Sequence, residues 1–505
     1  MRDNGVISQV RAGVAGRAWQ KRPADTAAGN PLPWLAGVSA ALTLFHLALI
    51  SPGLGLGWDE TVYVSQVSGE APAAFFSAPR ARGITYLVAP LTALTPSITA
   101  LRVYMAVLAG CGLFLALWVW RRLLPAPVLG FAGGLFAGLW VTMFYASQAM
   151  PNLWVAYGAL AAVGCFVRAV RDPDDRWAPV GMAAGVAFAA LMRPTDAVWL
   201  ALPLAVAAVA MRARRWWLLI VALGAGLAVG SAEWIAEAYV SYGGLAERLD
   251  RASEIQGRLG WYFSVDDHVR ALGGRLLCRP CDVPWRYPVA TLWFVALPLL
   301  VAAGVRAAVR ARHHGTEVVV ATVVGTVLAA PYLFTVGYAA PRFLLPAYAL
   351  LALPVAYGLV RACRPRGRGR RIVVLTVTAH LAIQYAMADS TADRVRRDTV
   401  DLGRVTAELN ALGVRPPCVV SGVEAIRVAF RAGCASRQPD GHDESITPER
   451  LAATALDQPV AIVVWGGGRP PPYAAAWPAH PLPDLGNWTG LRAYVSGVRP
   501  PEAGR

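Results

Sequence analysis

The chain has 505 residues, of which 56% are hydrophobic and only 15% are charged, and its mean hydropathy is +0.45. Soluble globular proteins carry about 25% charged residues, so this composition indicates a membrane protein and excludes an ordinary water-soluble enzyme. The net charge of +16 is almost all arginine, because Lys21 is the single lysine. These charges lie in short blocks between apolar stretches, which argues against a nucleic-acid partner.

The first 31 residues are predicted to form a basic cytoplasmic tail, and a membrane domain is expected to follow over residues 32–388. About eleven apolar stretches there approach membrane-spanning length. They cover roughly 33–51, 98–120, 127–147, 152–170, 178–192, 196–211, 217–238, 288–305, 317–335, 343–360 and 371–388. The fifth and sixth are short and share the polar hinge "RPTD", so they form either two spans or one broken helix.

The distribution of arginine and lysine predicts the orientation. If the N-terminus is cytoplasmic, the inner segments contain basic blocks such as "RAWQKR", "RAVRDPDDR" and "RACRPRGRGRR". They hold more positive residues than the much longer outer loops, as the positive-inside rule requires. The large loops 52–97 and 239–287 are therefore predicted to lie outside the cytoplasm.

After residue 388 the composition becomes that of a soluble domain. Helical patterns such as "EAIRVAFRAG" alternate there with short β-branched runs such as "VAIVVWGGG". This alternation predicts a small α/β domain over residues 389–505, and an odd number of spans places it outside. The expected fold class is thus an α-helical polytopic membrane protein with a small C-terminal extracytoplasmic α/β domain.

Four of the seven cysteines fall in the predicted outer parts, where disulfides persist. Cys418 and Cys434 form one candidate bridge. Cys278 and Cys281, in "CRPC", form either a short-range disulfide or a redox pair. Four cysteines allow three connectivities, and the spacing alone does not choose among them.

Two adjacent carboxylates, Asp59 and Glu60, follow the first apolar span in "GLGWDETVYVSQ". Next to lipid, a carboxylate beside a second carboxylate and an aromatic ring has its pKa raised, as a general base requires. In the alternative interpretation, the pair solvates the start of a loop or caps a short helix. Tyr63, a few residues on, is a candidate to line the same cavity.

Arginines at isolated outer positions run against the inside bias. They are Arg80 and Arg82 in the first outer loop, Arg193 in "LMRPTDA" and Arg342 in "AAPRFLLPAY". Guanidinium groups suit phosphate, so these residues are candidate ligands of a lipid phosphate. The alternative is that each side chain extends to lipid headgroups.

These segments resemble those of a known superfamily. "GWDETVYVSQ", "LMRPTDAVWLALPLAV" and "PRFLLPAYALLALPVAYGL" are similar to motifs of polytopic GT-C glycosyltransferases, which include protein O-mannosyltransferases and lipid A aminoarabinose transferases. The resemblance spans about residues 33–360. It implies a polyprenyl-phosphate-linked sugar donor, transfer with inversion, and Asp59 as catalytic base. The implied acceptor is exported: a protein, a glycan, a lipid or a natural product.

One position departs from that pattern. Relatives often carry an acid after a proline in the second outer loop, where this chain has Asn152 in "SQAMPNLW". Dependence on a divalent cation is therefore in doubt. Asp266, Asp267 and His268 in "SVDDHVR" are candidate substitutes, or else an exposed turn. Gln148 is a further candidate to line the cavity.

Two other function classes remain open. A flippase or transporter of a lipid-linked substrate would carry ionisable groups in mid-span and often repeated halves, and the sequence has few of the former and no evident repeat. A non-enzymatic membrane scaffold would use the outer domain to bind a partner. Activity that depends on Asp59 separates the enzyme from both.

Overall fold

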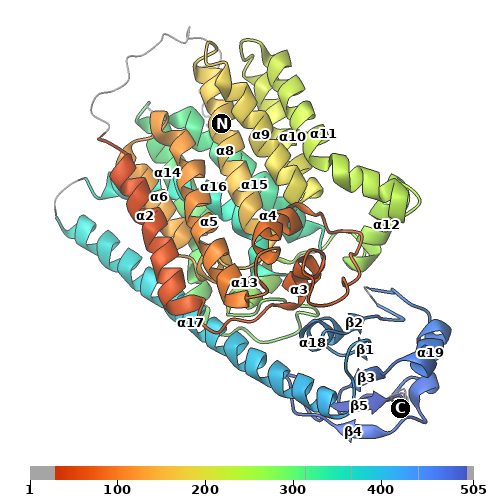
Figure 1. Cartoon of the computed structure of the whole chain (residues 1–505). Coiled ribbons are helices and arrows are strands. Elements are labelled where there is room, and N and C mark those ends of the chain that lie inside the picture. The colour runs from red at the N-terminus through yellow and green to blue at the C-terminus, as the bar shows by residue number, and fades with distance from the viewer. Residues whose placement is uncertain (1–28, 313, 365–366, 442, 498–505) are drawn as a thin grey trace.

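The computed structural model describes residues 29–312, 314–364, 367–441 and 443–497. A bundle of membrane helices and a small α/β domain are joined by the long helix α17, which runs diagonally across Figure 1. Most of the predicted basic tail, residues 1–28, lies outside the described residues.

Eight helices of the described chain are long and apolar enough to cross a membrane, so the protein is a multi-pass membrane protein. They are α2 with the π-turn η1 (Leu32–Phe45, His46–Ile50), α5 with η2 (Ile98–Trp118, Val119–Arg122), α8 (Pro151–Arg171), α11 (Trp216–Ser241), α14 (Pro288–Arg310), α15 (Gly315–Phe334), η3 with α16 (Pro341–Leu344, Leu345–Ala362) and α17 (Arg368–Ala411).

The expectation of about eleven full spans is not confirmed, because several predicted spans are short helices in the described structure. These are α6 (Ala126–Ala137), α9 (Trp177–Met192) and α10 (Pro194–Ala210); the further short apolar helix α4 (Gly83–Thr92) lies in the predicted loop 52–97. The third predicted span divides at Gly138 into α6 and α7 (Trp140–Tyr145). The fifth and sixth separate at Arg193, whose extended backbone precedes Pro194.

Helix α8 lies at the centre of the bundle, since 89% of its apolar stretch is buried inside the protein. Lipid tails are as apolar as the helices, so close packing of small residues holds such bundles together. Gly158 of α8 lies against the backbone of α9 at Gly185, and Gly230 of α11 lies against another α9 carbonyl. This contact region fixes α9 and therefore Arg193 at its end.

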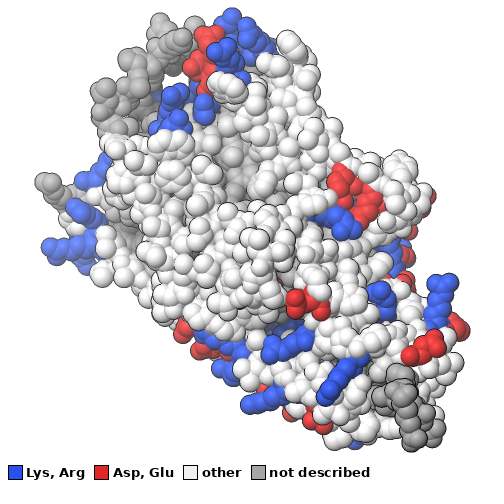
Figure 2. All heavy atoms as spheres, in the orientation of Figure 1, with Lys and Arg blue, Asp and Glu red and all other residues white. Residues whose placement is uncertain are grey.

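Short helices cover the end of the bundle that is nearest the α/β domain. They are α3 (Trp58–Ser65), α12 (Leu245–Ile255) and α13 (Val265–Leu272). Figure 2 shows that charged side chains gather at two opposite ends of the visible face, with a mostly uncharged belt between them. This is the surface expected of a protein embedded in a bilayer.

The predicted boundary between residues 388 and 389 lies inside α17. This helix has 44 residues and continues from the bundle to Ala411 without a break. At about 1.5 Å per residue it is long enough to cross a bilayer and extend well beyond it. The α/β domain is thus carried on a rigid helix rather than a flexible linker.

The described part of the α/β domain has a five-stranded sheet in the order β2-β1-β3-β5-β4. Strands β1 (Val419–Gly422), β2 (Ala435–Ser436) and β3 (Val460–Val464) are parallel, whereas β4 (Ala479–Pro481) and β5 (Arg492–Val495) are antiparallel to their neighbours. Helices α18 (Ala425–Ala432) and α19 (Pro448–Asp457) and turn η4 (Pro472–Ala474) complete it. Helix α18 packs against α17 and α3.

Candidate active site

Asp59 lies in the first turn of α3, between two arginines. Its Oδ1 accepts a hydrogen bond from Arg80 at 2.6 Å, and its Oδ2 accepts one from Arg342 at 2.8 Å. The carboxylate is 30% exposed, so it is accessible from outside. Three segments distant in sequence thus meet at this point: the start of α3, the segment before α4, and η3.

Aromatic rings hold the Arg80 guanidinium in place. It lies 5.4 Å from the Trp58 ring centre and 5.1 Å from that of Tyr63, within the range of cation–π attraction. Its Nε also donates to the Ser77 hydroxyl at 3.0 Å. Tyr63 itself is buried, so it supports Arg80 from within.

Arg342 is oriented from the opposite side. One nitrogen donates to the Leu276 carbonyl at 3.2 Å and to the Tyr145 hydroxyl at 3.4 Å, while the other binds Asp59. Its side chain is only 12% exposed. Little of the guanidinium therefore reaches solvent except beside the carboxylate.

Arg193 is the third arginine near Asp59. Its Nε lies 3.0 Å from Asp196, and one terminal nitrogen donates to the Tyr332 hydroxyl at 3.0 Å. The Tyr332 hydroxyl in turn donates to Asp196. Arg193 and Arg342 both lie within 5.6 Å of the Phe343 ring centre, so this ring bridges them.

The site carries an excess of positive charge. Three arginines (Arg80, Arg193 and Arg342) pair with two carboxylates (Asp59 and Asp196), which leaves one positive charge in excess among these five side chains, and Asp443 also interacts electrostatically with Arg80. The expectation of a raised pKa for Asp59 is wrong: burial by itself raises it, but Arg80 and Arg342 outweigh burial and hold the pKa below its ordinary value. Asp59 is ionised at neutral pH, and the arginines can accept a further anion.

Glu60 points away from this cluster although it is the next residue. Its two oxygens accept from Arg102 at 2.6 and 2.9 Å, and also from the backbone N–H groups of Ala149 at 2.7 Å and Gly57 at 2.9 Å. Both Glu60 and Arg102 are almost completely buried. Glu60 thus caps α3 and ties it to α5, the alternative that the sequence left open.

Arg82 pairs with glutamates of α11 rather than with Asp59. It binds Glu237 at 2.5 Å and Glu233 at 3.3 Å, both near the end of α11, and its guanidinium lies over the Phe76 ring. Among the predicted phosphate ligands, Arg80, Arg193 and Arg342 gather at one site, and Arg82 belongs to a neighbouring acidic cluster.

Gln148 is flanked by Ser147 and Ala149, whose backbone groups bond to the buried Glu60–Arg102 pair, and Asn152 lies in the first turn of α8. Both side chains are buried. The Asn152 amide has no hydrogen-bond partner among the described residues.

The predicted acidic substitutes lie on α13. Asp266 binds Arg270 and the Trp285 indole, so its charge is already paired. Burial raises the pKa of Asp267. His268 is buried with Nε2 3.3 Å from the Tyr332 carbonyl, and burial lowers its pKa to about 4, so it is neutral at pH 7. His268 therefore supports the Tyr332 side of the site.

The donor set does not fit a divalent cation. In the described part of the chain, no group of three or more His, Cys, Asp or Glu side chains is placed to hold a metal ion. Both oxygens of Asp59 face arginines, and Asn152 stands where an acid was expected. We derive no step through a metal.

The structure contains the disulfides Cys278–Cys281 and Cys418–Cys434. The first lies in the loop after α13, and Cys278 pairs through its backbone with Ala339, close to η3. The second joins the two residues that directly precede strands β1 and β2.

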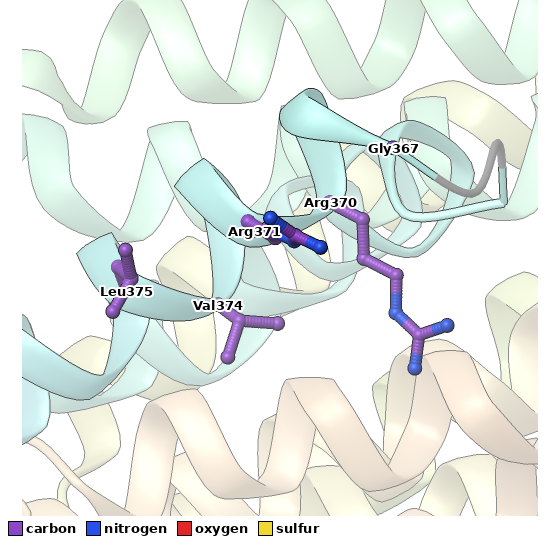
Figure 3. A pocket seen from close by; sticks show the side chains of 5 residues that line it. All are labelled: Gly367, Arg370, Arg371, Val374 and Leu375. Atoms are coloured by element: carbon purple, nitrogen blue, oxygen red, sulfur yellow. The ribbon is translucent and has the colours of Figure 1, made fainter.

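A shallow pocket lies far along the chain from this site, at the start of α17 (Figure 3). Gly367, Arg370, Arg371, Val374 and Leu375 line it, and the Arg370 side chain extends away from the α17 backbone. Its arginines belong to the basic block that the sequence assigns to the cytoplasmic side, at the end of α17 opposite the α/β domain.

Solved structures share this arrangement over nearly the whole chain. ArnT from Cupriavidus metallidurans bound to undecaprenyl phosphate superposes with a TM-score of 0.66 and 13% identity, covering 93% of this chain and 99% of ArnT. The chain has a GT-C-like fold. The apo form of ArnT matches with a TM-score of 0.64 and 13% identity over the same shares of the two chains.

The oligosaccharyltransferase of Archaeoglobus fulgidus, tethered to an acceptor peptide, matches less closely. Its TM-score is 0.52 at 14% identity, covering 86% of this chain and 69% of that one. No protein-family model matches the sequence, and a search of curated proteins finds no significant match. The GT-C-like fold agrees with the resemblance that the short motifs indicated.

Sequence reasoning missed three residues that shape the site. Asp196 is present in the quoted "RPTD" and was not singled out, although a proline-bounded acid after an arginine signals an ion pair. Tyr332 and Arg248 lay in segments without a motif. Only the fold brings Tyr332 to Arg193 and Arg248 to the backbone of Arg80.

Proposed function

We propose that this protein is an integral membrane glycosyltransferase that moves a sugar from a polyprenyl-phosphate donor to an exported acceptor, with inversion at the sugar carbon. The observation that carries the proposal is the Asp59 carboxylate between Arg80 and Arg342, at one end of a GT-C-like bundle. The similar ArnT structure binds undecaprenyl phosphate, which makes a lipid phosphate the first ligand to test.

Arg80, Arg342 and Arg193 would receive the donor phosphate. Guanidinium groups form strong charge-assisted bonds to phosphate oxygens, and this set has one positive charge in excess. The bonds would strengthen as the sugar–oxygen bond breaks and charge develops on the departing polyprenyl phosphate. The arginines therefore stabilise the transition state more than the bound donor.

Asp59 would act as the general base. The acceptor's O–H or N–H group attacks the sugar carbon from the face opposite the phosphate, the bond to the phosphate oxygen breaks, and Asp59 takes the acceptor's proton. Before donor binds, Arg80 and Arg342 keep the carboxylate a weak base. Phosphate shares those charges when it binds, so the pKa of Asp59 rises and its basicity increases only in the loaded site.

The proposed orientation places this site outside the cytoplasm. It rests on the arginine blocks at the inner segments and on the two disulfides, which need an oxidising compartment. The sugar and the acceptor class, whether protein, glycan, lipid or natural product, follow from the assay rather than from the contacts.

The test uses purified protein with a panel of undecaprenyl-phosphate sugars, each combined with candidate protein, glycan and lipid acceptors, and measures release of undecaprenyl phosphate. Asp59→Asn should lower turnover by about 100-fold or more, the scale of a lost general base. Asp401→Asn is the matched control, since Asp401 is 29% exposed, also pairs with an arginine, and lies on α17 away from the site. Equal turnover in the two variants would remove Asp59 from the reaction.

A further inference from the structure

The segment that carries Arg80 has no regular structure of its own. Described residues 72–82 form neither helix nor strand, so no backbone ladder fixes Arg80 opposite Asp59. Contacts from elsewhere must hold this segment, because loose positioning of a binding group weakens its interaction with a ligand.

Arg248 of α12 supplies the contacts to the backbone carbonyls of Ala78 and Arg80. Its Nε donates to the Ala78 carbonyl at 3.0 Å, and one terminal nitrogen donates both to the Arg80 carbonyl at 3.0 Å and to Glu237 at 2.8 Å. The other terminal nitrogen donates to the Trp234 carbonyl at 2.6 Å. The side chain is completely buried, so these contacts replace water entirely.

Trp234, Glu237 and Tyr242 surround Arg248, and these four residues are called the clamp below. The Arg248 guanidinium lies between the rings of Trp234 and Tyr242, at 4.4 and 4.8 Å from their centres. The Tyr242 hydroxyl donates to the Phe76 carbonyl at 2.7 Å, which fixes the same segment a few residues earlier.

Glu237 joins this clamp to the far end of the segment. One oxygen accepts from Arg248 and the other accepts from Arg82 at 2.5 Å. The backbone of Arg80 is thus held by Arg248 and the side chain of Arg82 by Glu237. Arg82, which the sequence suggested as a phosphate ligand, instead attaches the end of this segment to Glu237.

The same helix also contacts the outer domain. Arg251, nearly one turn after Arg248, binds Glu444 at 2.7 Å and approaches the Gly441 carbonyl. Helix α12 therefore lies between the segment that carries Arg80 and the α/β domain.

We propose that Arg248 is a positioning residue that holds the backbone of Arg80 so that its guanidinium meets the donor phosphate. This proposal rests on the proposed function, because it assigns Arg248 a role through Arg80. Lysine cannot replace it, since a single ammonium group lacks the planar fork that reaches three carbonyls and a carboxylate together.

The test is a double-mutant cycle read out as affinity for undecaprenyl phosphate in detergent. Arg248→Lys keeps a positive charge beside Glu237 and should weaken binding by roughly fivefold to tenfold in the parent. In an Arg80→Met background it should cause no further loss, because its effect passes through Arg80. Equal losses in both backgrounds would reduce Arg248 to a structural residue and overturn the proposal.

Hydrogen exchange provides a measurement that does not need the donor. Backbone amides between Ala74 and Arg82 should exchange about fivefold faster in Arg248→Lys, and to a smaller extent in Tyr242→Phe. Arg404→Lys, an exposed arginine of α17, should leave both exchange and affinity unchanged.

The two proposals fail in different ways. If the parent does not bind undecaprenyl phosphate, the proposed donor is wrong. Hydrogen exchange alone then tests whether Arg248 holds the backbone around Arg80. If the parent binds and Arg80→Met weakens binding, but Arg248→Lys changes neither exchange nor affinity, only the positioning role is refuted.

Discussion

Replacing Glu60 by glutamine changes one atom and removes the charge opposite Arg102. In the parent, each Glu60 oxygen accepts from Arg102 and from one backbone N–H group, those of Ala149 and Gly57. An amide offers one acceptor oxygen and two N–H donors, so one backbone N–H group loses its partner. In the variant, the Arg102 side chain, which is 2% exposed, has only neutral carbonyl oxygens as acceptors and no carboxylate.

The expected cost follows from this burial. Breaking a buried ion pair by neutralising one partner costs about 3–5 kcal/mol, since the remaining charge stays out of water. An exposed pair contributes less than about 1 kcal/mol, so Asp401→Asn is the matched control, with its partner Arg404 66% exposed. Replacing Glu60 and Arg102 together by methionine should recover most of the loss, because no buried charge then remains.

The assay is reversible unfolding of the purified protein in mixed micelles, followed by fluorescence. Glu60→Gln should lose several times more unfolding free energy than Asp401→Asn. If the two variants differ by less than about 1 kcal/mol, the pair is not the buried element described above, and α3 is held by other contacts.

The remaining predictions concern the outer domain and the helix bundle. Burial raises the pKa of Asp443 to about 6, so the native state holds a proton that the unfolded chain releases near pH 4, and stability falls as pH rises through that window. Asp443→Asn should therefore be more stable than the parent above pH 6, by up to about 3 kcal/mol, and equal to it below pH 4 in pH-dependent melting curves. Gly230→Ala should lower the melting temperature and weaken binding of undecaprenyl phosphate, since an added Cβ would lie 2.2 Å from a backbone carbonyl of α9. Gly224→Ala, where no atom lies within 4 Å, should be neutral; equal effects of the two would refute close packing of α11 on α9.

The sequence was informative where one physical property dominates. Apolar runs of membrane length predicted the bundle, and alternating helical and β-branched patterns predicted the α/β domain, because burial in lipid or in a core imposes these compositions. Asp59, Arg193 and Arg342 stood out because charged residues beside lipid need a partner or a function.

The sequence was less informative about lengths and breaks. The stretches 127–147 and 371–388 have the composition of spans, yet one divides at Gly138 and the other continues to Ala411. Hydropathy measures transfer into lipid, and it does not register where a neighbouring helix allows a break or where a helix leaves the bilayer.

The tertiary structure decided which partner each charged residue of the site has. By sequence, Asp59 and Glu60 are equivalent neighbours, and so are Arg80 and Arg82. Successive helical positions point about 100° apart, so α3 directs Asp59 to the outer arginines and Glu60 into the bundle. Arg80 and Arg82 diverge because Glu237, from a helix more than 150 residues away in the chain, captures only one of them. Composition and periodicity determined that charges gather at the ends of a membrane bundle. The partner of each charged side chain was decided only by the packing of distant helices. Ion pairing depends on distances of a few ångströms, and no local sequence pattern encodes these distances.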